Sequence, residues 1–154
     1  METQSLEKIV REHPFFEGMR EEHIAVLTGC AKNVRFEVGE FLLKEGEDAR
    51  VLYLLRAGKV GIEAHVPGKG AMQVGRVGEG DVLGWSWLVQ PYRWHFDARA
   101  VEVTRALELD GTCLREKFEK DHELGYEVLK RFVAVIAQRL EWTHMQVLDV
   151  YRNG

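Results

Sequence analysis

Apolar residues follow a helical spacing at the start of the chain. Leu6, Ile9 and Val10 recur at the interval of an α-helix until Pro14 interrupts the pattern. The same spacing predicts a second helix over Arg20–Ala31. Residues 1–32 are therefore predicted to form short N-terminal helices.

From Val34 onward the period of the pattern changes to two, which is typical of half-buried β-strands. Short apolar runs then alternate with glycine turns as far as Leu109, at residues 34–38, 41–43, 51–55, 60–64, 74–77, 96–103 and 106–109. Many short strands at this spacing favour an antiparallel barrel or jelly roll. Residues 33–110 are predicted to form a β-roll, so the fold class is mainly β with flanking helices.

The remainder, residues 111–154, is predicted to be helical. Thr112 is a candidate N-cap, and a long helix is expected from about Glu123 to Tyr151. Apolar residues and one threonine fall at alternating steps of four and three, which is typical of a coiled-coil seam. The seam consists of Leu129, Val133, Ile136, Leu140, Thr143, Val147 and Val150.

The length of this helix bears on its partner. Roughly 29 residues at a rise of 1.5 Å span ~43 Å, which is longer than a small barrel covers. We therefore expect a homodimer through the C-terminal helix. The alternative is one wide apolar face packed on the protein's own barrel.

Three motifs indicate a family. They are His13-Pro14-Phe15-Phe16, the glycine-punctuated segment from Gly39-Glu40 through Glu45-Gly46-Glu47 to Val60, and Gly78-Glu79-Gly80-Asp81-x-x-Gly84. With the order of helices and strands, they resemble the cyclic-nucleotide-binding domain. The closer resemblance is to the sensor half of the catabolite activator family of bacterial regulators. It covers nearly all of the chain as a single domain, 1–154.

In this family, residues 80–97 correspond to the phosphate-binding cassette. The resemblance implies that Gly84 and the amides of the next three residues cradle a cyclic phosphate at the N-terminus of a short helix. Trp85 stands where the family has a Glu that accepts from the ribose hydroxyl, and Trp94 where it has an Arg that pairs with the phosphate. The ligand-binding candidates are Gly84, Trp85, Ser86, Trp87, Arg93, Trp94, His95 and Thr143.

These substitutions leave three interpretations open. Losing the charged partner of a buried phosphate costs ~2–5 kcal/mol, which is roughly 30- to 4,000-fold in affinity. The pocket is then packed shut by Trp85 and Trp94, takes a different and unknown small molecule, or still binds a cyclic nucleotide through Arg93 and His95. We expect a stand-alone regulatory module that does not bind ordinary cyclic AMP or cyclic GMP tightly.

Composition excludes several other function classes. The net charge of −4 and pI near 5.9 disfavour DNA binding, and no helix-turn-helix domain follows the long helix, so a separate effector protein is expected. The histidines show no metal-binding spacing and no serine has a nucleophile motif, so neither an enzyme, a cofactor nor a metal site is expected. The chain has no apolar run long enough to cross a membrane and no signal peptide, so it is predicted to be cytoplasmic. Cys30 and Cys113 give no disulfide framework, so the protein is predicted to be reduced.

Overall fold

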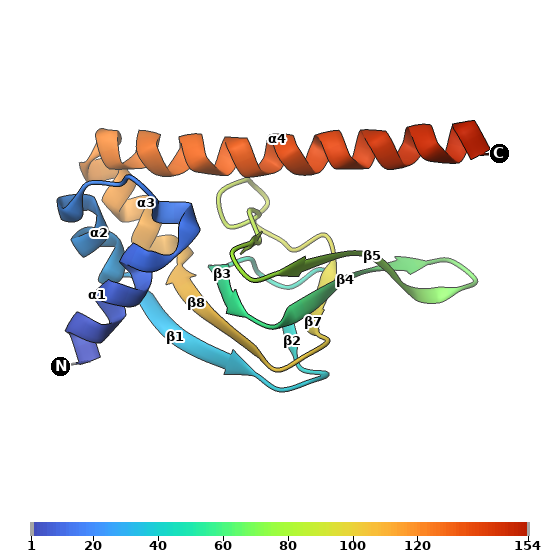
Figure 1. Ribbon diagram of the computed structural model, residues 1–154, viewed down its shortest axis with the longest axis horizontal. Coiled ribbons are helices and arrows are strands. Elements are labelled where there is room, and N and C mark those ends of the chain that lie inside the picture. Colours follow the sequence, from blue (N-terminus) through green and yellow to red (C-terminus); the bar gives the residue numbers. More distant parts are fainter. Residues whose placement is uncertain (1, 154) are drawn as a thin grey trace. The chain divides into compact units, whose positions relative to one another are not determined.

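The computed structural model describes residues 2–153 and confirms the predicted fold class. An antiparallel β-roll is flanked by helices, with a long helix at the C-terminal end (Figure 1). The chain forms two compact units, Met1–Lys117 and Phe118–Gly154.

The first unit begins with α1 (Glu2–Glu12), the 3-10 turn η1 (Pro14–Phe16) and α2 (Glu21–Thr28). His13 caps η1, since its Nδ1 accepts a hydrogen bond from the amide of Phe15 at 3.1 Å. The predicted second helix was too long at its C-terminus. It ends at Thr28 because Ala31 already pairs with Leu109 as the first residue of β1.

Two four-stranded sheets form the β-roll, in the orders β1-β8-β3-β6 and β2-β7-β4-β5. Every neighbouring pair is antiparallel. The strands are β1 (Ala31–Phe36), β2 (Phe41–Leu43), β3 (Val51–Ala57), β4 (Lys59–Val66), β5 (Gly70–Gly78), β6 (Val82–Leu83), β7 (Asp97–Ala100) and β8 (Thr104–Asp110). β7 is shorter than the predicted run of 96–103, because the amides of Val101 and Glu102 both turn to the carbonyl of Lys59.

The core lies on the central strands β3 and β8. Leu52, Leu54, Leu55 and Leu107 are at most 1% exposed. β3 is buried at consecutive positions, so both of its faces are covered. This explains why the sequence there shows a continuous apolar run rather than strict alternation.

The helix α3 (Gly111–Lys120) is capped by Asp110 and not by Thr112 as predicted. The Oδ1 of Asp110 accepts from the amide of Cys113 at 2.8 Å, so the last strand residue also serves the helix. Only a glycine fits at the first helical position, because a Cβ on Gly111 would lie 2.9 Å from the carbonyl oxygen of Arg50.

Cys30 and Cys113 form a disulfide, so the prediction that the cysteines are unpaired was wrong. They are 83 residues apart in the sequence, and their Cα atoms are 5.7 Å apart. The pairing of β1 with β8 causes this proximity. Ala31 lies opposite Leu109, which places the end of α2 beside the first turn of α3.

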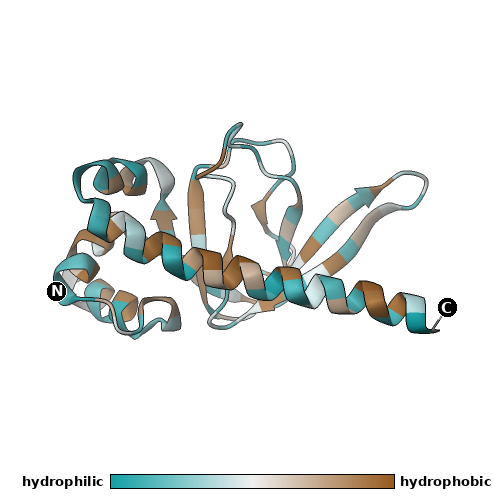
Figure 2. Ribbon diagram, turned by 90° about the horizontal axis from the view of Figure 1, so that it is seen from above, coloured by the Kyte–Doolittle hydropathy of each residue, from teal (hydrophilic) through white to brown (hydrophobic). Residues whose placement is uncertain are grey.

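The second unit is dominated by α4 (His122–Asn153), one residue longer at its start and two at its end than predicted. Hydrophobic and hydrophilic residues alternate along it (Figure 2). The apolar seam residues are all exposed, from 37% at Leu129 to 71% at Val150. Within the described residues, no helix is both long and apolar enough to cross a membrane.

Candidate functional site

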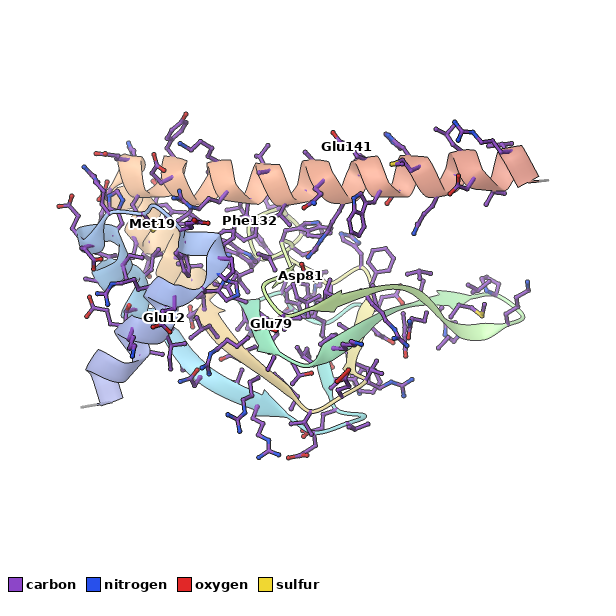
Figure 3. The ribbon with its side chains drawn as sticks, in the orientation of Figure 1. Glu12, Met19, Glu79, Asp81, Phe132 and Glu141 are labelled. Carbon is purple, nitrogen blue, oxygen red and sulfur yellow. A yellow bond between two sulfur atoms is a disulfide. The ribbon has the colours of Figure 1, made fainter. Side chains whose placement is uncertain are left out.

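The cassette, residues 80–97, leaves β5 and returns into β7 within the first unit. Its first limb is fixed by main-chain pairing, since β6 pairs with β3 through Leu83 opposite Tyr53. The carboxylate of Asp81, labelled in Figure 3, accepts from the amide of Gly78 at 2.7 Å and closes the turn before β6. The cassette therefore begins from a rigid sheet edge.

The middle of the cassette contains turns and no helix. The amide of Leu88 donates to the carbonyl of Trp85 at 3.1 Å, and that of Val89 to the carbonyl of Ser86 at 3.3 Å. The short helix that the resemblance implied is reduced to this pair of turns. A helix attracts an anion through the aligned peptide dipoles of successive turns, so this shorter segment offers a weaker field to a phosphate.

Trp94 occupies the space beside the glycine at which the phosphate cradle would begin. Gly84 has a φ of +94°, and a Cβ built on it would lie 2.9 Å from the Cη2 and Cζ3 atoms of Trp94. The side of Gly84 that would carry a side chain is thus in contact with the far edge of the indole. Trp94 is 6% exposed, so the ring is part of the core.

The other aromatic residues of the cassette differ in burial. Trp87 is fully buried, whereas Trp85 is 37% and Phe96 42% exposed. Trp94, and not Trp85, is therefore the substituted position whose side chain fills space inside the β-roll.

Arg93 lies on the turn at residues 46–48. Its Nη1 is 2.9 Å from the Oδ1 of Asp48 and donates to the carbonyl of Gly46 at 3.1 Å. Asp48 also pairs with Arg50 at 3.0 Å. About half of the Arg93 side chain is exposed, so its ion pair with Asp48 lies at the surface. The space beside Gly84 is occupied by the buried neighbour, Trp94.

The returning limb of the cassette is fastened to the same turn by its backbone. Trp94 exchanges main-chain hydrogen bonds with Gly46 and Glu47, at 2.9 and 3.1 Å. The carboxylate of Asp97 accepts from the amide of Glu45 at 2.7 Å, while His95 is exposed. These bonds hold the backbone on both sides of Trp94, so the indole cannot leave Gly84 without a side-chain rotation or an opening of the turn.

Arg115 of α3 holds the cassette from the other side, a role that no sequence motif predicts. Its Nη1 donates to the carbonyl oxygen of Trp87, and its guanidinium lies 4.8 Å from the ring centroid of Tyr92. A charge-assisted bond and a cation–π contact together fix the turn between these two residues. In sequence Arg115 is one of many charged residues on a helix surface, which is why sequence reasoning missed it.

The structure brings most of the predicted site residues together on one loop, whereas Thr143 belongs to the other unit. Gly84, Trp85, Ser86, Trp87, Arg93, Trp94 and His95 lie on one loop of the first unit. Thr143 belongs to the second unit, where its Oγ1 donates to the carbonyl of Arg139 at 2.9 Å.

Comparison with known families agrees with this geometry. The model of the cyclic nucleotide-binding domain matches residues 33–121, which span the β-roll, the cassette and α3. The chain belongs to the cyclic nucleotide-binding domain family. No curated protein matches it.

Solved structures show the same fold in regulatory proteins. A cyclic nucleotide-binding protein from Geobacter metallireducens is 27% identical, with a TM-score of 0.77 over 86% of this chain and 96% of that one. The sensor domain of the transcriptional regulator DNR from Pseudomonas aeruginosa is 17% identical, with a TM-score of 0.71 over 92% and 95%. The regulatory subunit of a cAMP-independent protein kinase A from Trypanosoma brucei is 21% identical, with a TM-score of 0.69 over 84% and 46%.

These findings confirm the predicted resemblance to the sensor half of bacterial activators. The fold is that of a cyclic nucleotide-binding domain, and the DNR sensor domain shares it.

Proposed function

We propose that this domain is a non-enzymatic regulatory module whose cassette does not bind cyclic AMP or cyclic GMP tightly. The observation that carries the proposal is the contact between the Trp94 indole and Gly84. The Arg that would pair with the phosphate is replaced by an apolar ring, and that ring is buried where the cradle begins.

Magnitudes favour this proposal over a surviving nucleotide site. Removing the charged partner of a buried phosphate costs ~2–5 kcal/mol. Displacing a buried Trp from its packing costs about as much as truncating one, ~3–5 kcal/mol. A micromolar ligand has only ~8.2 kcal/mol of binding free energy, so the two costs together remove most or all of it.

Known relatives support the idea that this fold regulates without cyclic AMP. The Trypanosoma brucei regulatory subunit belongs to a cAMP-independent kinase. A triple mutant of that subunit, in which one change introduces an arginine, was solved with cyclic AMP bound in its A site. By analogy, restoring the two charged residues of the cassette is the direct test for this chain.

The experiment compares the wild-type protein with Trp94→Arg and with Trp85→Glu/Trp94→Arg. Thermal unfolding is followed with cyclic AMP, cyclic GMP and cyclic dinucleotides at millimolar concentration. We expect no shift in Tm for the wild type with any of them, and a shift with cyclic AMP or cyclic GMP for the double variant. A ligand at 100 times its Kd adds ~2.7 kcal/mol, which such an assay resolves easily.

A clear shift of the wild-type protein with one nucleotide would contradict the proposal. Arg93→Ala then identifies the source of the affinity. Loss of the shift would show that Arg93 leaves Asp48 to pair with the phosphate. An unchanged shift would assign binding to the amides of the cassette.

The exposed seam of α4 supports a second element of the proposal, a homodimer that transmits the state of the cassette to a separate effector protein. Apolar side chains at positions spaced by three and four are exposed along the helix, including Val133 at 63% and Leu140 at 54%. Sedimentation analysis should give a dimer for the wild type and a monomer for Val133→Glu/Leu140→Glu. A wild-type monomer at tens of micromolar would refute the dimer.

A further inference from the structure

The disulfide between Cys30 and Cys113 lies at the edge of the core, where both cysteines line a surface hollow. The hollow has a volume of about 500 Å³ and is lined by both cysteines and by the ends of α2, β1, β8 and α3. Cys30 is 7% exposed, and Cys113 is more accessible. Attack by a small thiol is therefore expected at Cys113, the more exposed of the two cysteines.

The hollow has a negative charge. Glu108, Asp110 and Glu116 line it, and Lys32 is the only basic residue among the lining residues. Lys32 pairs with Glu108 at 3.1 Å, which leaves the other two carboxylates uncompensated within the lining. Such a field concentrates cations and repels anions at low ionic strength.

The disulfide also connects to the cassette through one helix. Cys113 lies in the first turn of α3, and Arg115, two residues further along the helix, donates to the carbonyl oxygen of Trp87 and stacks on Tyr92. The bridge thus ties the junction of α2 and β1 to the helix that holds the cassette in place.

We propose that Cys30–Cys113 is a reversible thiol–disulfide exchange site that accepts cationic or neutral thiols and controls how firmly α3 holds the cassette. A thiolate attacks the sulfur of Cys113, the S–S bond breaks, and the sulfur of Cys30 leaves with the electron pair and takes up a proton. A second thiol then resolves the mixed disulfide. The net reaction converts two thiols and the protein disulfide into two protein thiols and one small disulfide. This inference does not depend on what the cassette binds.

The first experiment measures accessibility and charge selectivity. The oxidised protein is treated with cysteamine, 2-mercaptoethanol or 3-mercaptopropionate in native buffer, and free thiols are counted over time. Each rate is divided by the rate of the same thiol on a neutral peptide disulfide, which removes differences in intrinsic reactivity. We expect the normalised rate to be about tenfold higher for cysteamine than for 3-mercaptopropionate at low salt, and nearly equal at 1 M salt.

Glu116→Gln is the matched variant, because it removes one charge from the rim and leaves the cysteines in place. Its preference for the cationic thiol should fall severalfold. Three outcomes would overturn the proposal: no disulfide after treatment with the neutral disulfide of 2-mercaptoethanol, reduction no faster than global unfolding, or equal normalised rates for all three thiols at low salt.

The second experiment measures the coupling to the cassette. Hydrogen exchange of residues 85–92 should be at least severalfold faster in the reduced protein and in Cys30→Ser/Cys113→Ser than in the oxidised protein. Arg115→Ala should give fast exchange in both redox states, since it removes the contact that transmits the effect. Identical exchange of this segment in oxidised and reduced wild-type protein would show that the disulfide is only a structural link.

Discussion

Replacing Trp94 with alanine tests the packing on which the proposed function depends. The side chain is 6% exposed, so nearly all of its surface is removed from water. An indole buries ~150–250 Å², and at ~25 cal/mol per Å² this corresponds to ~4–6 kcal/mol. Measured truncations of buried tryptophans cost ~3–5 kcal/mol. We therefore expect Trp94→Ala to lower the free energy of unfolding by about 4 kcal/mol.

The assay is urea unfolding followed by far-UV circular dichroism, because the substitution removes a fluorophore. The urea concentration at the midpoint should fall, while the slope of the unfolding free energy against urea concentration stays constant. A constant slope indicates that unfolding exposes the same surface area in the variant and the wild type. Trp85→Ala is the matched control. Trp85 is the same residue type on the same loop but is 37% exposed, so by buried area its replacement should cost about two thirds as much.

The vacated space also provides a rescue test. Trp94→Ala leaves an apolar cavity beside Gly84, and cavities of this kind bind small aromatic molecules. Millimolar indole should raise the stability of Trp94→Ala and leave that of the wild type and of Trp85→Ala unchanged. The reasoning is refuted if Trp94→Ala costs less than ~1 kcal/mol, or no more than Trp85→Ala, since neither result is compatible with a buried ring.

Further substitutions test the surrounding contacts. Gly84→Ala combines a positive φ with a Cβ 2.9 Å from Trp94, so it should cost ~1–3 kcal/mol, and a double-mutant cycle with Trp94→Ala should recover the steric part. Arg115→Ala removes the charge-assisted bond to the carbonyl of Trp87 and should cost ~1.5–3 kcal/mol in urea unfolding. Burial lowers the pKa of His13, so the unfolded chain binds the proton more tightly. The contribution of neutral His13 to the free energy of unfolding should be complete above about pH 6.5 and should be lost as the pH falls through the depressed pKa. Unfolding measured from pH 7 to 4 should therefore show a smaller decline in stability for His13→Asn than for the wild type.

The sequence predicted the architecture because the signals that determine it are local. Alternating residues in the strands and the apolar spacing of the long helix identify each element from neighbours in the chain. The errors fall where two elements compete for one residue. Asp110 ends β8 and also caps α3, so a search for a cap after the strand selects Thr112 instead.

The disulfide and the state of the cassette required three-dimensional information. Cys30 and Cys113 meet only because Ala31 lies opposite Leu109 in the sheet, and no local pattern specifies that register. The substitution of charged residues by tryptophans is visible in the sequence. That Trp94 is buried against Gly84, whereas over a third of the surface of Trp85 is exposed, depends on which side of the loop each residue faces.

Gly84 explains how such a cassette can exchange a ligand for a side chain without changing its fold. A glycine at this turn satisfies the positive φ, and its missing Cβ lets another group approach the backbone closely. In a nucleotide-binding cassette the approaching group is a phosphate, and here it is the edge of an indole. The flanking hydrogen bonds to residues 46–49 involve the backbone at Trp94 and Tyr92, so they do not depend on the indole itself. Changing residue 94 therefore alters what fills the space while the backbone frame stays in place. Trp94→Arg loses the packing of the indole, so its response to a nucleotide is measured as a shift from its own ligand-free Tm.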